Sequence, residues 1–340
     1  MVLALQRSLS ATLSKDRVNQ VINNQNDMKK VFFPLSPLLL LFYLCSCNNS
    51  NTGTTTQNEA NAVPEVKAVF INGDSIHYVD AGKGAPIVLV HGIMGDYRTW
   101  EAQMDDFSGN HRVIAYSLRH GYPNKQILDS TADFSINQNV RDLTELIKAL
   151  KLKPVHLVGH SSGALVSLLT TIGSPELVRS LMSGEAPVMS LLANVPGGDT
   201  LGMNFGKAIT PAIEALSKNE DEKAVEIFID AVMDDSQYFA KHRPEIREGI
   251  MANTVQLKGH FLYAKGELPP VSCDELRKIK TPVLVLQGEK SPSFFNAINS
   301  ELERCLPNEV KAILPNASHG LEYENPTEFN KVVLGFIDKN

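Results

Sequence analysis

The stretch of sequence that decides the fold reads Val155-His156-Leu157-Val158-Gly159-His160-Ser161-Ser162-Gly163. Its first four residues predict a buried β-strand, and the small residues from Ser162 to Ile172 predict a helix directly after it. Gly159, Ser161 and Gly163 match the pattern Gly-x-Ser-x-Gly, in which a serine occupies a sharp turn between a strand and a helix. We therefore expect Ser161 to be an exposed nucleophile at a helix N-terminus, where the helix dipole favours negative charge. The alternative is a glycine-rich turn with an inert serine.

Alternating strand and helix signals extend on both sides of this stretch. Further apolar strands are predicted at residues 66–72, 76–79, 87–90, 112–116, 178–182, 283–286 and 310–314. Apolar residues at helical spacing predict helices at 137–150 and 326–337. Fully apolar strands that alternate with helices are typical of a mainly parallel sheet covered on both faces, so the sequence predicts an α/β fold.

The strand signal disappears between Pro187 and Glu275. In that interval one helical face is apolar, formed by Val225, Phe228, Ile229 and Val232. A structureless connection of this length is uncommon inside a compact domain. We therefore expect a core at residues 66–186 and 276–340, interrupted by a helical lid at 187–275.

Two other strand ends carry residues that suit the chemistry of an activated serine. The segment His91-Gly92-Ile93-Met94-Gly95 follows the strand at 87–90, and the backbone N–H groups of Ile93 and Ser162 are candidates for an oxyanion hole. His319 follows the last strand and precedes the last helix, so it can reach a serine at the centre of the sheet and act as its base. The alternatives are a simple glycine turn and a surface histidine. His91 and His160 are expected to be structural.

Five segments resemble the α/β-hydrolase superfamily in their order along the chain. They are Asp80-Ala81-Gly82, Val90-His91-Gly92, Gly159-His160-Ser161-Ser162-Gly163, Leu284-Val285-Leu286-Gln287-Gly288 and Ser318-His319-Gly320. The resemblance covers about residues 66–340 and implies an α/β-hydrolase fold with the lid inserted after the sixth strand. It does not indicate a substrate, because this fold hosts esterases, thioesterases, lactonases, C–C hydrolases, peptidases and non-enzymatic receptors.

The acidic residue departs from the commonest pattern of this superfamily. Most relatives place an Asp a few residues after the seventh strand, where this chain reads Gly288-Glu289-Lys290-Ser291. Another branch takes its acid from the loop after the sixth strand, which here reads Ser183-Gly184-Glu185-Ala186-Pro187. The segment at 117–124 also resembles that branch. The sequence therefore favours Glu185 as the acid, with Glu289 as the alternative.

Together these residues predict a serine hydrolase that acts on an ester, a thioester or a related small acyl substrate. Ser161 attacks, His319 transfers the proton and Glu185 orients His319. A C–C hydrolase or lactonase that uses the same residues is an alternative, and so is a non-catalytic binding protein with this fold. Four aromatic residues are candidates for an acyl pocket, unless each only packs the lid on the core: Trp100, Phe228, Phe239 and Phe261.

The composition limits the partners that this chain is expected to have. With 43% hydrophobic and 21% charged residues it is typical of a soluble globular protein, and its net charge of −6 gives no basic field for a nucleic acid. No metal-ligand spacing or phosphate-binding loop occurs, so neither a metal nor another cofactor is expected. Nothing in the sequence indicates that Cys273 and Cys305 pair, and we expect them to be buried or free thiols. We also expect a monomer.

The first 65 residues differ from the rest of the chain. Met28-Lys29-Lys30 precedes an apolar run that ends in Leu44-Cys45-Ser46-Cys47, which resembles a bacterial lipobox with Cys47 as the lipidated residue. We expect an over-extended reading frame at 1–27, a lipoprotein signal peptide at 28–46 and a polar tether at 47–65. Lipid on Cys47 would anchor the protein to a membrane of the bacterial cell envelope. A plain signal peptide or an N-terminal membrane anchor is the alternative.

Overall fold

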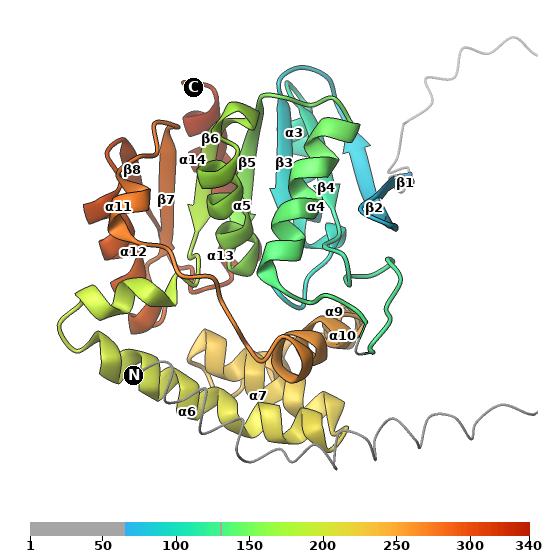
Figure 1. Cartoon of the computed structure of the whole chain (residues 1–340), viewed down its shortest axis with the longest axis vertical. Helices are drawn as coiled ribbons and strands as arrows, with labels where there is room; N and C mark the ends of the chain where they lie inside the picture. Colours follow the sequence, from blue (N-terminus) through green and yellow to red (C-terminus); the bar gives the residue numbers. More distant parts are fainter. Residues whose placement is uncertain (1–64, 130) are drawn as a thin grey trace, which may run out of the picture. The chain divides into compact units, whose positions relative to one another are not determined.

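The computed structural model describes residues 65–129 and 131–340, and in this part of the chain eight strands form one sheet (Figure 1). The strands are β1 (Val66–Ile71), β2 (Asp74–Ala81), β3 (Pro86–Val90), β4 (Arg112–Tyr116), β5 (Val155–His160), β6 (Val178–Gly184), β7 (Val283–Gly288) and β8 (Glu309–Leu314). Their order across the sheet is β1-β2-β4-β3-β5-β6-β7-β8. The pairs β1–β2 and β2–β4 are antiparallel, and every pair from β4 to β8 is parallel. This is the mainly parallel sheet that the sequence predicts.

Helices cover both faces of the sheet, because side chains of the buried strands alternate between two apolar clusters. Val88 and Val90 of β3 belong to one cluster, which also contains buried residues of α4 (Ile136–Ala149), α5 (Ser162–Gly173) and α12 (Ser293–Cys305). Ile87 and Leu89 belong to the other, which contains buried residues of α3 (Glu101–Ser108) and α14 (Pro326–Ile337). A strand whose successive side chains point to opposite faces has to be apolar throughout when both faces are covered. The short helix α13 (Leu321–Glu324) precedes α14.

Between β6 and β7 the described chain forms helices and no strand. These helices are α6 (Gly198–Ser217), α7 (Asp221–Met233), α8 (Tyr238–Lys241), α9 (Pro244–Met251), α10 (Thr254–Lys258) and α11 (Cys273–Leu276). They have an apolar cluster of their own, in which Ala215 of α6, Val225 of α7 and Leu257 of α10 are buried. In Figure 1, α6, α7, α9 and α10 lie at the ends of β3, β5 and β6 where those parallel strands finish.

The expectation that Cys273 and Cys305 are free thiols is wrong. A disulfide joins Cys273 at the start of α11 to Cys305 at the end of α12, with their Cα atoms 5.1 Å apart. The two residues are 32 positions apart, with β7 between them, so only the folded sheet brings them together. The bond fixes the point at which the inserted helices rejoin the core.

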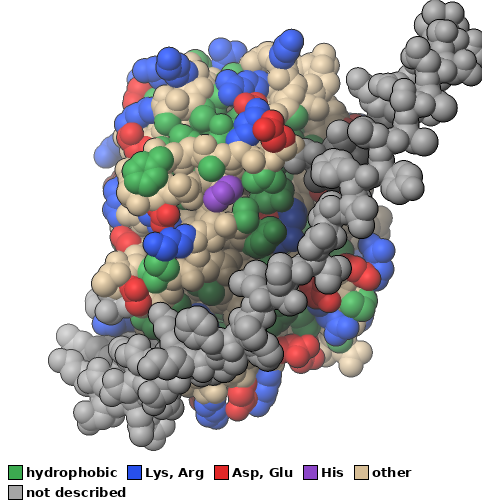
Figure 2. Space-filling view, turned by 90° about the vertical axis from the view of Figure 1, so that its right-hand side faces the viewer, with side chains coloured by type: hydrophobic (Ala, Val, Ile, Leu, Met, Phe, Trp, Pro, Cys, Tyr) green, Lys and Arg blue, Asp and Glu red, His purple; other side chains and the backbone are tan. Residues whose placement is uncertain are grey.

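The predicted lipobox with Cys47 lies outside the described residues, as do the predicted signal peptide and nearly all of the predicted tether. Within residues 65–129 and 131–340, no helix is both long and apolar enough to cross a membrane. On the face seen in Figure 2, basic and acidic side chains are interspersed, as the nearly balanced charge leads one to expect.

Candidate active site

Ser161 lies on the tight turn between β5 and α5. Its backbone angles are φ 53° and ψ −125°, a strained conformation for a residue with a side chain, and its N–H donates to the Gly184 carbonyl over 2.8 Å. A Cβ atom on Gly163 would lie 2.2 Å from the carbonyl oxygen of Val90, so only glycine fits there. The expectation that Ser161 is exposed is wrong, since 9% of its surface is accessible.

Glu185 and His319 meet at the ends of β6 and β8. His319 Nδ1 lies 2.6 Å from Glu185 Oε2, and both side chains are buried. A carboxylate only accepts, so Nδ1 carries the proton and Nε2 is the nitrogen left to act as a base. Glu185, like Ser161, has a positive φ, of 51°. Strained residues of this kind concentrate at functional sites.

The loop after β7 donates hydrogen bonds to Glu185, whereas its own glutamate has a different partner. Ser291, where most superfamily members have an aspartate, donates its hydroxyl to Glu185 Oε1, and the Gly288 N–H donates to the same oxygen over 2.9 Å. Glu289 instead accepts the N–H of Asn316 over 2.8 Å and has an exposed side chain. The serine that replaces the usual acid has thus become a hydrogen-bond donor to an acid on the neighbouring strand.

Two backbone amides beside Ser161, those of Ile93 and Ser162, find no acceptor among residues 65–129 and 131–340. A Cβ on Gly92 would lie 3.0 Å from Ser161 Cβ, so the segment after β3 packs directly against the serine. Among the hydrogen bonds of the described residues, none has the N–H of Ile93 or of Ser162 as its donor. Unpaired amides next to a nucleophile are the geometry that an oxyanion hole requires.

Two aromatic rings pack against the ring of His319. Phe295 of α12 stacks on it, with ring centroids 4.0 Å apart and an interplanar angle of 10°, and the ring of His160 lies 4.7 Å away. Burial is the main cause that lowers the pKa of His319, and the hydrogen bond that its Nδ1–H donates to Glu185 opposes it. His319 is therefore neutral near pH 7, as a general base must be. The sequence pattern gives no signal for Phe295, because an apolar helix residue beside a strand looks like any core residue.

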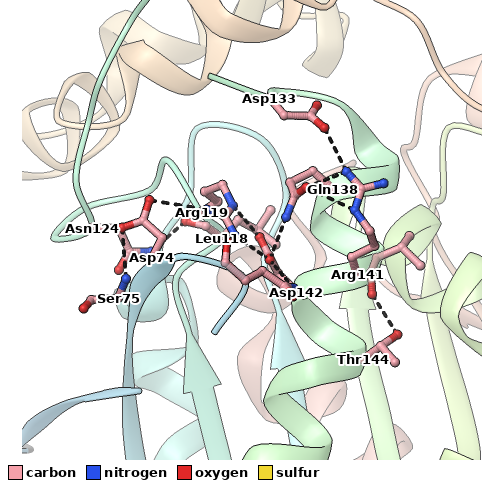
Figure 3. A network of polar contacts seen from close by, with 12 residues as sticks. Asp74, Ser75, Leu118, Arg119, Asn124, Asp133, Gln138, Arg141, Asp142 and Thr144 are labelled. Atoms are coloured by element: carbon pink, nitrogen blue, oxygen red, sulfur yellow. Dashed lines mark hydrogen bonds and ion pairs between the residues drawn. The ribbon is translucent and has the colours of Figure 1, made fainter. Parts of the chain in front are cut away.

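A buried ion-pair network fixes the segment that follows β4. Arg119 donates to Asp142 of α4 over 2.6 and 2.7 Å and also pairs with Asp74, as Figure 3 shows. The neighbouring Leu118 N–H donates to His91 Nε2 over 2.9 Å, and His91 Nδ1 lies 2.7 Å from the Gly92 carbonyl. His91 is thus a buried neutral imidazole that braces the Ile93 segment, in agreement with its expected structural role.

The four predicted pocket residues fall into two places. Phe228 and Phe239 are buried in the cluster of the inserted helices, and Phe261 packs on it, with its ring edge-on to Phe228 at 5.7 Å. Met94 and Ile93 contact the same cluster, so these three aromatics adjoin the candidate oxyanion segment. Trp100 does not join them. It is fully buried in the core beside Phe329, because its indole fills the layer between the sheet and α14.

Comparison with known proteins agrees with this architecture. Residues 87–332 match the sequence model of the Alpha/beta hydrolase family. The chain belongs to that family. The predicted α/β-hydrolase fold is therefore confirmed.

Several known proteins are similar to this α/β hydrolase at low sequence identity. It is 24% identical to the (E)-2-((N-methylformamido)methylene)succinate hydrolase of Acinetobacter baylyi, over 78% of this chain and 95% of the relative. It is 27% identical to a putative 2-succinyl-6-hydroxy-2,4-cyclohexadiene-1-carboxylate synthase of Bacillus subtilis, over 78% and 96%. Among solved structures, a Bacillus subtilis carboxylesterase matches with a TM-score of 0.64 at 19% identity, over 82% of this chain and 92% of that one.

Proposed function

We propose that this α/β hydrolase is a serine hydrolase that cleaves a small ester, thioester or related acyl compound through an acyl-enzyme. Ser161 attacks the acyl carbon as His319 Nε2 takes its proton, and the N–H groups of Ile93 and Ser162 hold the oxyanion. His319 then returns the proton to the leaving group, and a water molecule releases the acyl group by the same steps. Glu185 keeps Nδ1 protonated and stabilises the imidazolium that forms.

The observation that carries this proposal is the contact between His319 and Glu185 over 2.6 Å. It occurs at the same edge of the sheet as the strained turn of Ser161, so residues from three separate segments of the chain meet at that edge. Burial of a carboxylate and an imidazole costs desolvation free energy, which their pairing only offsets. Buried pairs of this kind concentrate at functional sites, so the pair supports a chemical role.

A fluorophosphonate probe tests the proposal, because it reacts with activated serines and needs no knowledge of the substrate. We expect the full chain to be labelled on Ser161, and Ser161→Ala to abolish the label. Failure to label folded protein would favour a binding protein with this fold. A panel of p-nitrophenyl esters of increasing chain length, with acyl thioesters, then identifies the acyl preference.

A lactone is a second candidate substrate, favoured by one specific likeness. A solved structure described as an N-acyl homoserine lactone degrading enzyme matches this chain with a TM-score of 0.62 at 22% identity, over 79% of this chain and all of that one. Ring opening of a lactone uses the same attack on an acyl carbon. Faster turnover of N-acyl homoserine lactones than of any open-chain ester would favour this candidate.

We further propose that the protein works outside the cytoplasm, anchored through lipid on Cys47. The Cys273–Cys305 disulfide supports export, since disulfides persist in oxidising compartments. Cys47→Ser is expected to move the protein from the membrane fraction to the soluble fraction. Native protein that is soluble and carries no lipid by mass spectrometry would contradict the anchor.

A further inference from the structure

A second buried acid–histidine pair is in contact with His319. His160, the residue before the candidate nucleophile, has its Nδ1 3.0 Å from Glu322 Oε1 and its Nε2 2.7 Å from the backbone carbonyl oxygen of His319. The two side chains are 5% and 0% exposed, so water does not screen them. Gln103 of α3 donates to the backbone carbonyl of Glu322 over 2.9 Å and holds α13 in place.

The partners of His160 decide its protonation state. A carbonyl oxygen only accepts hydrogen bonds, so Nε2 must carry a proton to bond with His319. Nδ1 faces a carboxylate whose two oxygens have no other partner among the described residues. A buried carboxylate without hydrogen bonds is strongly unfavourable unless an opposite charge neutralises it. Burial opposes the charged imidazole, but the charge and hydrogen bond of Glu322 outweigh it and raise the pKa of His160.

We propose that His160 and Glu322 form an ion pair that positions His319 and favours the neutral form of its imidazole. His160 is a positioning residue, because it acts only through the backbone and the ring of His319. This inference rests on the proposed role of His319 as the base.

The electrostatic effect follows from the distances. The ring of His160 lies 4.7 Å from the ring of His319, and a positive charge that close in a buried site disfavours a second one. Burial lowers the pKa of His319 most, and the charge of His160 lowers it further, by more than Glu322 raises it. The other groups that face His160 are Glu185, His91 and the Tyr323 ring.

Histidine titration by NMR in the Ser161→Ala protein tests the ion pair without any substrate. In Glu322→Gln, His160 loses its counter-charge and becomes neutral, so the pKa of His319 is expected to rise by about 0.5–1 unit. With a substrate in hand, the acidic limb of kcat/KM should move to higher pH by the same amount in an otherwise intact enzyme. Glu328→Gln removes a half-buried carboxylate of α14 that pairs with Lys331 and should change neither quantity.

The double variant His160→Gln/Glu322→Gln separates this effect from a loss of folding. Glutamine has nearly the shape of the glutamate at 322, and the glutamine at 160 can still donate a hydrogen bond to the His319 carbonyl. In the double variant the pKa of His319 should equal that in Glu322→Gln. If Glu322→Gln does not fold, the double variant is used for the titration in its place. A pKa of His319 that stays unchanged or falls in the folded variant overturns the proposal. If no substrate is ever found, the proposed function fails, yet the NMR titration still decides the ion pair.

Discussion

The loops at the strand ends and the helices inserted above them are held in place by different interactions. The loops are tied to one another by buried hydrogen bonds, such as those from the Ser161 N–H to Gly184 and from the Gly288 N–H to Glu185. The inserted helices pack around an apolar cluster that also includes Met94 of the loop after β3, and polar side chains such as Asn253 add to this attachment. From this difference we propose that the sheet fixes the reacting groups, whereas the inserted helices control access to them.

Replacement of the nucleophile should have the largest effect. Ser161→Ala is expected to lower kcat by about 10⁴-fold or more, because no other group can form the acyl-enzyme. The fold should persist, since the change is small and local. Ser162→Ala is the matched control, because Ser162 contributes only its backbone N–H. Equal losses in both variants, measured on the best ester of the panel, would mean that the nucleophile is assigned to the wrong residue.

Loss of the Glu185 charge should have the second largest effect on activity. In Glu185→Gln the amide would donate to His319 Nδ1 and force the proton onto Nε2, so kcat is expected to fall by about 10³-fold. The residual activity should persist to lower pH, because the hydrogen bond that His319 donates to Glu185 raises the pKa of His319 and its loss lowers that pKa. Glu289→Gln, on the next loop, should be mild. Activity that survives in Glu185→Gln but not in Glu289→Gln would move the acid to that loop.

The sequence predicted the sheet well because each buried strand is a continuous apolar run, as in Ile87–Val90 and Val283–Leu286. The candidate catalytic residues could be located in the same way, since each lies on the loop that follows a strand. Trp100 could not be placed, because a large aromatic beside a strand end fits a core and a pocket equally well. The supporting roles of Ser291 and Phe295 depend on contacts between β6, β7 and α12 that only the folded sheet creates.

The disulfide could not be predicted because thiol spacing says nothing about distance in the fold. It links the returning inserted helices to the core, and its loop of 32 residues should contribute about 3–4 kcal/mol to the free energy of unfolding. Reduction with dithiothreitol, or Cys273→Ser, is expected to lower that free energy in urea unfolding by this amount. Reductant should then have no further effect on Cys273→Ser, which serves as the control. Equal stability with and without reductant in the native chain would show that the bond is absent.

Removal of the polar attachment of the inserted helices should have the smallest effect. This prediction tests the comparison between the loops and the inserted helices most directly. Asn253 is 1% exposed, donates to Asp96 Oδ2 over 2.8 Å and accepts the Tyr122 N–H over 2.8 Å, so it joins α10 to the segments after β3 and β4. Asn253→Ala would leave both partners without their bond, at a cost of about 1–3 kcal/mol.

We expect kcat/KM in Asn253→Ala to fall by about tenfold, mainly through KM, together with faster hydrogen exchange across residues 249–258 and unchanged exchange in β5 and β6. Asn204→Ala, an exposed position on α6, is the matched control and should leave both measurements unchanged. Faster exchange that spreads into β5 would show that the inserted helices and the sheet form one cooperative unit. In that case the inserted helices would do more than control access, because they would also help to fix the geometry of Ser161.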